Sequence, residues 1–211
     1  NIQVTKQLQG YNAQHAEHWT SQIAQAVTRL TGHPCADLPE DLPVHIISSN
    51  THSVHNCLSS FPRHHRAEIE AWGAEHHPEL CAVEWVDGED LLYALTRHWL
   101  AAHPERQAER EREDHEGGMI RLASTALTGI SVEIIDMTRI TAEGIDSGIF
   151  SDDQELCTEG LLVNIDYAFG QQAEEILAIL LQLFGANVRS VNILGKAGAL
   201  VGERGDILVA N

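Results

Sequence analysis

The residues best suited to bind a small anion follow an apolar segment near the C-terminal end of the chain. Residues 161–166 are apolar on both faces, as a central parallel strand is, and a helical pattern starts at Gln171. A short glycine-containing loop between strand and helix brings backbone N–H groups and the positive end of the helix dipole to one place. The pattern predicts an anion site formed by Tyr167, Ala168, Phe169, Gly170 and Gln171.

A second glycine segment follows the next predicted strand, residues 190–194. It reads Gly195-Lys196-Ala197-Gly198, and a Gly-Asp pair opens a last predicted strand at 206–209. Lys196 could neutralise a phosphate if it points into a pocket, and it is an ordinary surface lysine if it points outward. The P-loop pattern GxxxxGK[ST] and the dinucleotide pattern GxGxxG are both absent.

A polar segment follows the first predicted strand, residues 44–48. Loops at the carboxyl edge of a parallel sheet often carry function, so we expect this segment to form a second wall of the site. Its turn-forming composition explains the same residues without a ligand. The residues concerned are Asn50, Thr51, His52 and Ser53.

The chain holds 13 histidines, and three residues of one segment suggest a metal site as an alternative. His52, His55 and Cys57 are chemically suitable zinc ligands, but H-x2-H-x-C is not a recognised ligand spacing, and no HExxH motif is present. A G-x-S-x-G nucleophile motif is absent as well. We therefore expect neither a metal nor an organic cofactor, and a metal-dependent hydrolase built on His52 and His55 stays the second rival reading.

The order of these elements resembles the central section of the nucleoside phosphorylase family. The likeness covers residues 161–211: a strand ending in a glycine loop, an amphipathic helix, a strand entering Gly-x-Ala-Gly, and a Gly-Asp-Ile-Leu-Val strand. The matching positions are 167–171, 195–198 and 205–209. A closer resemblance, at 47–53, 164–170 and 192–198, is to uncharacterised bacterial proteins with a phosphorylase-like domain.

The resemblance implies a protein that binds a nucleoside or nucleotide and cleaves an N-glycosidic bond, with inorganic phosphate or water as the nucleophile. It implies that the first loop contributes to the phosphate or ribose site, that residues 195–198 line the nucleoside pocket, and that the protein is a homo-oligomer. The family's Glu-Met-Glu ribose-binding segment would lie beyond Asn211, so these residues supply half of such a pocket. A non-catalytic protein that senses nucleotides or assembles a complex is the first rival reading.

The amino-acid composition limits the kinds of molecule that this protein is expected to bind. The chain has 211 residues, with 13 basic against 31 acidic side chains and a net charge of −18. That balance argues against binding to nucleic acid or to an anionic membrane, whereas a backbone-lined pocket can still hold a small anion. The chain begins at Asn1 without a Met, and no secretory signal or membrane-spanning stretch is evident. Four cysteines without a CxxC pair indicate free thiols, and we expect a cytoplasmic protein.

The order of the predicted helices and strands, which position these residues, indicates an α/β fold with a mainly parallel sheet and flanking helices. We expect helices at 14–30, 63–75, 89–102, 119–127 and 171–184, strands at 44–48, 81–86, 132–136, 161–166, 190–194 and 206–209, and a loop at 49–60. Residues 104–116 are highly charged and predict a solvated helix or linker. The predicted organisation is an N-terminal region, 1–116, ending in that linker, and a phosphorylase-like region, 117–211, or one continuous domain.

Overall fold

The structure of the chain, a computed structural model, describes residues 2–84, 88–122, 130–146, 159–168 and 170–195. The side-chain surroundings of residues 2–16 and 171 lie outside that description. The predicted strand at 206–209 also lies outside the described residues.

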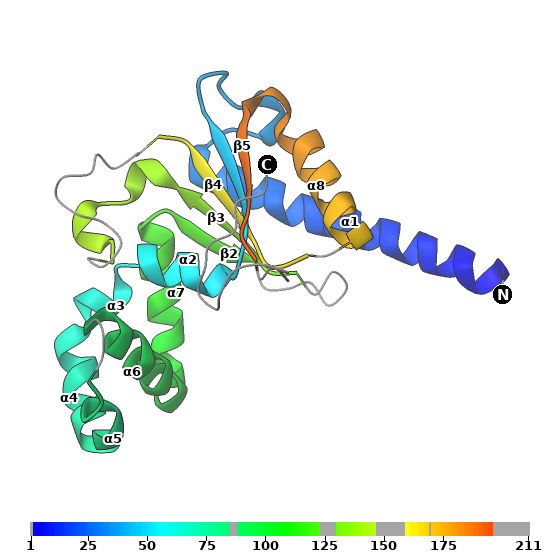
Figure 1. The fold of residues 1–211 in the computed structure, drawn as a ribbon. Helices are drawn as coiled ribbons and strands as arrows, with labels where there is room; N and C mark the ends of the chain where they lie inside the picture. The colour runs from blue at the N-terminus through cyan, green and yellow to red at the C-terminus, as the bar shows by residue number, and fades with distance from the viewer. Residues whose placement is uncertain (1, 85–87, 123–129, 147–158, 169, 196–211) are drawn as a thin grey trace, which may run out of the picture.

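The described part of the chain is built on a five-stranded sheet in the order β2-β3-β4-β1-β5 (Figure 1). The strands are β1 (Val44–Ser48), β2 (Met119–Leu122), β3 (Val132–Asp136), β4 (Leu161–Ile165) and β5 (Val188–Ile193). Strand β1 pairs in parallel with β4 and β5, whereas β3 is antiparallel to both β2 and β4. The α/β class is confirmed, and β1 from the N-terminal region lies between strands of the C-terminal region.

The expectation of a mainly parallel sheet is wrong, because the sheet is mixed. The difference arises partly at residues 119–122, which form β2 rather than the start of a helix. Met119 packs on one face of the sheet and Ile120 on the other, which is the alternation of a strand. A helix-like spacing of apolar residues over such a short segment does not outweigh pairing with β3.

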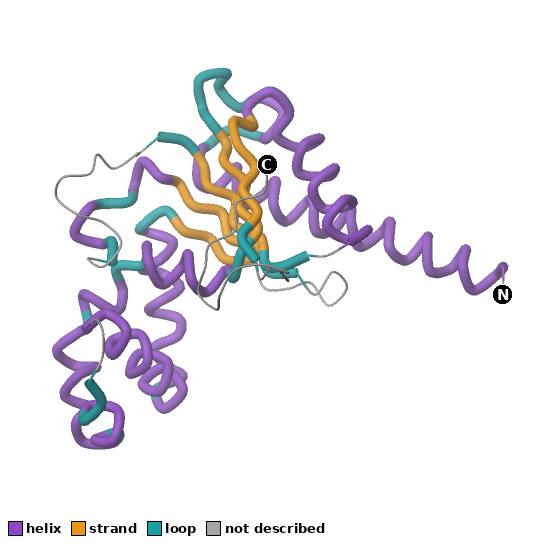
Figure 2. The backbone as a smooth tube through the Cα atoms, in the orientation of Figure 1, coloured by secondary structure: helices purple, strands orange, loops and turns teal. Residues whose placement is uncertain are grey.

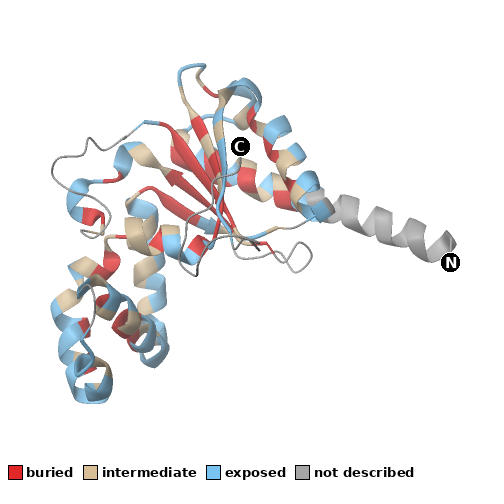
Figure 3. Ribbon diagram, viewed as in Figure 1, coloured by how far each residue is buried: buried red, intermediate tan, exposed pale blue. Residues whose placement is uncertain are grey.

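Two long helices cover one face of the sheet. The C-terminal half of helix α1 (Ile2–Thr31) and helix α8 (Gly170–Phe184) pack their apolar sides against it, and the N-terminal half of α1 projects beyond the sheet (Figure 1). The helical spacing of Trp19, Ile23 and Val27 places all three in this core. This is the main hydrophobic core, and Figure 3 shows it as the buried layer between the sheet and the two helices.

The opposite face carries α2 (Thr51–Leu58) and α7 (Gln107–Glu116), and the chain between them forms a helical lobe (Figure 2). The lobe contains α3 (Phe61–His64), α4 (Arg66–His76), α5 (Pro78–Cys81) and α6 (Gly88–Ala102). Its own small core is formed by Phe61, Ile69, Leu92, Leu95 and Trp99. Short 3-10 turns lie at Cys35–Asp37, Pro104–Arg106, Met137–Arg139, Ala142–Gly144 and Gly185–Asn187.

Two further predictions are wrong in this half of the chain. Residues 51–58 form α2 rather than a loop, because the Asn50 side chain accepts a hydrogen bond from the His52 N–H and caps the helix. Of the strand expected at 81–86, Cys81 ends the short helix α5, residues 82–84 form no strand, and residues 85 and 86 lie outside the described residues; Pro78 at the first helical position favours the helix. Of the two possibilities for residues 104–116, a solvated helix or a linker, the structure contains a helix, α7, over 107–116. One side of it is not solvated, since the side chains of Arg110 and Asp114 are 17 % and 11 % exposed.

The predicted absence of a membrane-spanning helix agrees with the described part of the chain. No helix there is both long enough and apolar enough to cross a bilayer.

Candidate functional site

A row of polar side chains crosses the sheet on the face that carries α2. Alternation along β3 turns Val132 and Ile134 toward α1 and α8, and turns Glu133 and Ile135 toward α2. Glu133 lies directly opposite Asn164 on β4 and Arg121 on β2. Three adjacent strands thus place an amide, a carboxylate and a guanidinium side by side, near the edge where β1 and β4 end.

A buried histidine joins this row to the helices above it. His55 of α2 is 3 % exposed, and its Nδ1 lies 2.5 Å from Oε1 of Glu133. Its Nε2 lies 3.2 Å from Oδ2 of Asp114 on α7, an ion-pair distance without the geometry of a hydrogen bond. Asp114 also accepts a 2.6 Å hydrogen bond from the Ser59 hydroxyl and lies 3.5 Å from Nε of Arg110. The imidazole therefore lies between two carboxylates, on an axis from the sheet to α7.

The charges of this cluster stabilise one another. Burial alone would lower the pKa of His55, but its pairing with Asp114 and Glu133 outweighs burial and raises that pKa. Burial would raise the pKa of Asp114, but His55, Ser59 and Arg110 lower it. The shifts of His55 and Asp114 both favour the charged form of each group, and pairing of this kind is how buried charges are tolerated.

This arrangement predicts how stability depends on pH. The raised pKa of His55 contributes stability that is present below its unfolded value of about 6.5 and is lost as pH rises through the folded value. The lowered pKa of Asp114 contributes stability that is present above its unfolded value of about 3.9 and is lost as pH falls through the folded value. We expect urea midpoints to be highest between about pH 4 and 6.5 and to decline above that window.

The matched control for the pH series is His64→Gln, because the His64 side chain is 66 % exposed. The urea midpoint of His64→Gln should decline at alkaline pH in the same way as that of the unmodified protein. A decline that disappears in His64→Gln would assign the effect to surface histidines and not to His55.

Two adjoining cavities open beside the buried cluster. The first has a volume of about 560 Å³ and is lined by His55, Asp114, His115, Glu133 and neighbouring residues of β2 and α7. The second has a volume of about 520 Å³ and lies between α2, α6, α7 and β2. Gln107, Arg110 and Arg121 line both, so the two cavities form one cleft.

The second cavity is basic. Arg97 of α6, Arg110 of α7 and Arg121 of β2 line it together with His52, and none of the described residues lining it is acidic. The Arg121 guanidinium lies 3.2 Å from Nε2 of His52. Partial burial lowers the pKa of His52, and Arg121 lowers it further, although Asp166 opposes the shift. The lowered pKa favours the neutral imidazole, whose Nε2 can accept a hydrogen bond from Nη2 of Arg121.

Two of the four residues predicted around the first polar segment, Asn50 and His52, line this cleft. Asn50, His52 and Asn56 line its basic end. Ser53 borders a neighbouring cavity of about 250 Å³, and Thr51 is buried, with its carbonyl oxygen 3.4 Å from Nδ2 of Asn164. The structure therefore brings Asn50 and His52 together with arginines that the sequence pattern did not connect to them.

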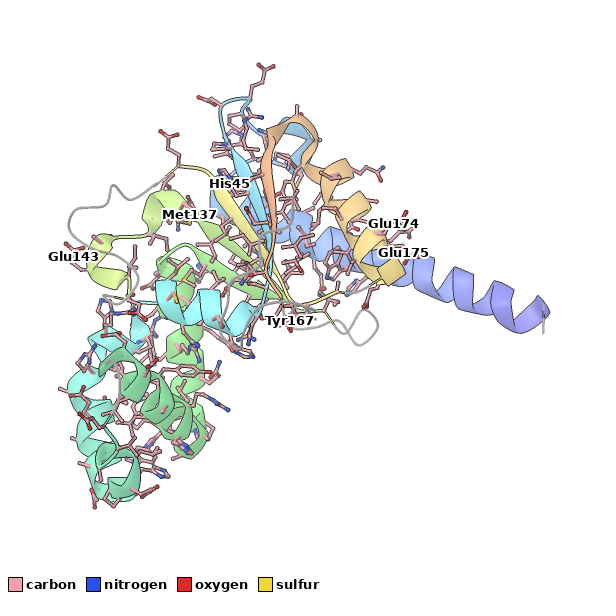
Figure 4. The ribbon with its side chains drawn as sticks, in the orientation of Figure 1. His45, Met137, Glu143, Tyr167, Glu174 and Glu175 are labelled. Carbon is pink, nitrogen blue, oxygen red and sulfur yellow. The ribbon has the colours of Figure 1, made fainter. Side chains whose placement is uncertain are left out.

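The predicted glycine-loop site lies only partly within the described residues. Tyr167 is 40 % exposed, and Figure 4 shows it at the end of the sheet, opposite to the end near His45. A Cβ built on Gly195 would lie 4.0 Å from the Tyr167 ring, so the first residues of the two predicted loops lie close together at this edge. Ala168 packs against the main core, and Gly170 begins α8 with φ +56°. Phe169, Lys196, Ala197, Gly198 and the side chain of Gln171 lie outside the described residues.

The alternative metal site does not assemble in the described part of the chain. Both nitrogens of His55 face carboxylates, and burial raises the pKa of the Cys57 thiol, with Asp146 adding to the effect. The group with ligand-like spacing in the described residues is instead His65, Glu109 and Glu113, where Glu109 pairs with Arg106 at 2.5 Å. Cys35, Cys57 and Cys81 are free thiols, as predicted, and Cys157 lies outside the described residues.

Sequence reasoning missed the residues that dominate this site. One local signal was available for Glu133, a single charged residue inside the apolar strand Val-Glu-Ile-Ile-Asp. Nothing local marks Asp114 or Arg110, because they belong to a helix with charges along its whole length. Their importance comes from contact with α2 and β3, which only the fold supplies.

Comparison with known proteins identifies a family but no function. No curated protein and no solved structure matches the chain. The model of one family, described as a family of unknown function, matches residues 1–211. The chain belongs to this family of unknown function, DUF6909.

Proposed function

We propose that this protein binds a nucleotide in the cleft between α2, α7 and β2, and that it is a nucleosidase-type or phosphorylase-type protein acting on an N-glycosidic bond. The observation that carries the proposal is the convergence of Arg97, Arg110 and Arg121 on one cavity. The chain has a net charge of −18, yet none of the described residues lining this cavity is acidic. Such a site favours an anionic ligand group, and guanidinium groups suit phosphate oxygens.

The rest of the cleft supports a ligand larger than phosphate alone. The adjoining cavity of about 560 Å³ falls within the usual range for small-molecule sites, roughly 300–1,000 Å³. Its lining combines apolar Met119 with polar Gln107 and Ser131 and with the acidic residues Glu111, Asp114 and Glu133. A sugar and a base could occupy this part while the phosphate lies at the arginines.

Substitution of Arg97 tests the binding proposal. We expect Arg97→Ala to weaken the binding of adenosine 5′-monophosphate by about 10–100-fold, because a charge-assisted contact to phosphate contributes about 1.5–3 kcal/mol. Isothermal titration calorimetry with adenosine 5′-monophosphate, adenosine and inorganic phosphate measures the effect. Adenosine should bind more weakly than its monophosphate in the unmodified protein, and the difference should shrink in the variant.

The matched control is Arg112→Ala. Arg112 is an exposed arginine of the helical region, as Arg97 is, but it lines neither cavity of the cleft. It removes the same charge, so its effect should stay within about twofold, as expected for exposed charges. Equal losses in Arg97→Ala and Arg112→Ala would mean that net charge, and not this cleft, governs binding. Binding without release of a base would identify the nucleotide-sensing alternative.

A further inference from the structure

Among the described residues, Glu133 is the one Asp, Glu, Lys or Arg that is classed as buried. Its side chain is 1 % exposed and lies in the middle of β3, where a charge is costly. Oε1 pairs with Nδ1 of His55, whereas Oε2 is buried and has no hydrogen-bond partner among the described residues. Glu133 also lines the cavity of about 560 Å³. A buried carboxylate oxygen beside a cavity calls for a hydrogen-bond donor from whatever occupies that cavity.

Glu133 lies close enough to the arginines for one small ligand to contact both. Arg121 is its direct neighbour on β2, and Cβ atoms of such opposed residues are about 4.5–5.5 Å apart. Arg121 and Arg110 line the basic cavity as well as the cavity that Glu133 lines. A ligand held by its phosphate at the arginines can therefore extend its sugar toward Glu133.

The neighbours of Glu133 fix its orientation. His55 holds Oε1, and Asp114 on the far side holds His55, so the carboxylate cannot turn freely. Asp114 is itself held by Ser59 and Arg110. His55 and Asp114 are positioning residues in this arrangement, and Oε2 is the atom left for a substrate or a water molecule.

We infer that the protein hydrolyses nucleoside 5′-monophosphates at the N-glycosidic bond and that Glu133 is the catalytic base. The inference rests on the proposed function and specifies its substrate class and its reacting group. Oε2 takes one proton from a water molecule, and the water oxygen forms a bond to the anomeric carbon. The bond from that carbon to the base nitrogen breaks, its electron pair stays on the nitrogen, and the nitrogen takes a proton from solvent. The products are ribose 5-phosphate and the free base, and Glu133 returns its proton to solvent.

The test is a hydrolysis assay with matched substrates and one isosteric variant. The unmodified protein is incubated with adenosine, guanosine, cytidine and uridine 5′-monophosphates and with the four nucleosides, and free base and ribose 5-phosphate are measured by chromatography. We expect release from at least one monophosphate and much slower release from the matching nucleoside. Glu133→Gln should lower the rate about 10²–10⁴-fold, the usual contribution of a general base.

Two measurements separate a catalytic effect from misfolding and from the failure of the proposed function. The affinity of Glu133→Gln for inorganic phosphate should stay within about twofold, because phosphate contacts the arginines alone, and circular dichroism should show a folded protein. Arg97-dependent binding without any release of base, or release that Glu133→Gln leaves unchanged, would overturn the inference while the binding proposal stands. Absence of Arg97-dependent binding would overturn both.

Discussion

Replacement of His55 by glutamine is expected to lower the free energy of unfolding by about 3–5 kcal/mol, the usual cost of removing one partner from a buried ionic group. The Glu133 carboxyl group, whose side chain is 1 % exposed, would lose the imidazole beside it. Asp114 would retain Ser59 and Arg110, so the uncompensated charge would be that of Glu133. Urea unfolding at pH 6, followed by circular dichroism, measures the difference.

The double variant His55→Gln/Glu133→Gln distinguishes this explanation from simple loss of packing. It removes the charge that the single variant leaves unpaired, so it should recover most of the lost stability. The exposed control His64→Gln should change the free energy of unfolding by less than about 0.5 kcal/mol. A double variant that is no more stable than His55→Gln alone would contradict the ionic explanation.

The sequence predicts the hydrophobic elements of this fold well. Strands at 44–48 and 132–136 and the helix at 89–102 follow from short apolar runs and a 3.6-residue period, and the structure contains β1, β3 and α6 there. Their burial is a local property, because the apolar residues themselves reveal which face packs. Helix α2 escaped prediction because its start is polar, and its cap at Asn50 resembles a turn in sequence.

The candidate site was harder to predict because its contacts are long-range. The sequence singles out His55 only as a possible metal ligand. Its partners Asp114 and Glu133 lie 59 and 78 positions away in the chain, and no spacing rule connects residues across such distances. The mixed sheet matters here as well, since the antiparallel pairing of β3 with β2 places Arg121 beside Glu133. The predicted fold placed Arg121 in a helix at 119–127, so it did not suggest that Arg121 lies beside Glu133.

The sheet on which the site is built depends on one glycine that approaches the neighbouring backbone closely. Gly160 has φ +83°, and a Cβ added there would lie 2.1 Å from the carbonyl oxygen of Pro43. That oxygen accepts the hydrogen bond from the Leu161 N–H, which begins the pairing of β4 with β1. We expect Gly160→Ala to lower the free energy of unfolding by about 2–5 kcal/mol, since the left-handed backbone costs about 1–2 and overpacking about 1–3.

Gly32→Ala is the matched control, because Gly32 also has a positive φ, +76°, but a Cβ there meets nothing within 4 Å. It should lose only the backbone contribution of about 1–2 kcal/mol. The difference between the two urea-unfolding free energies therefore isolates the contact with Pro43, and equal losses would refute it. Because β4 carries Asn164 next to Glu133, a displaced β4 should also weaken nucleotide binding in Gly160→Ala, whereas Gly32→Ala should bind as the unmodified protein does.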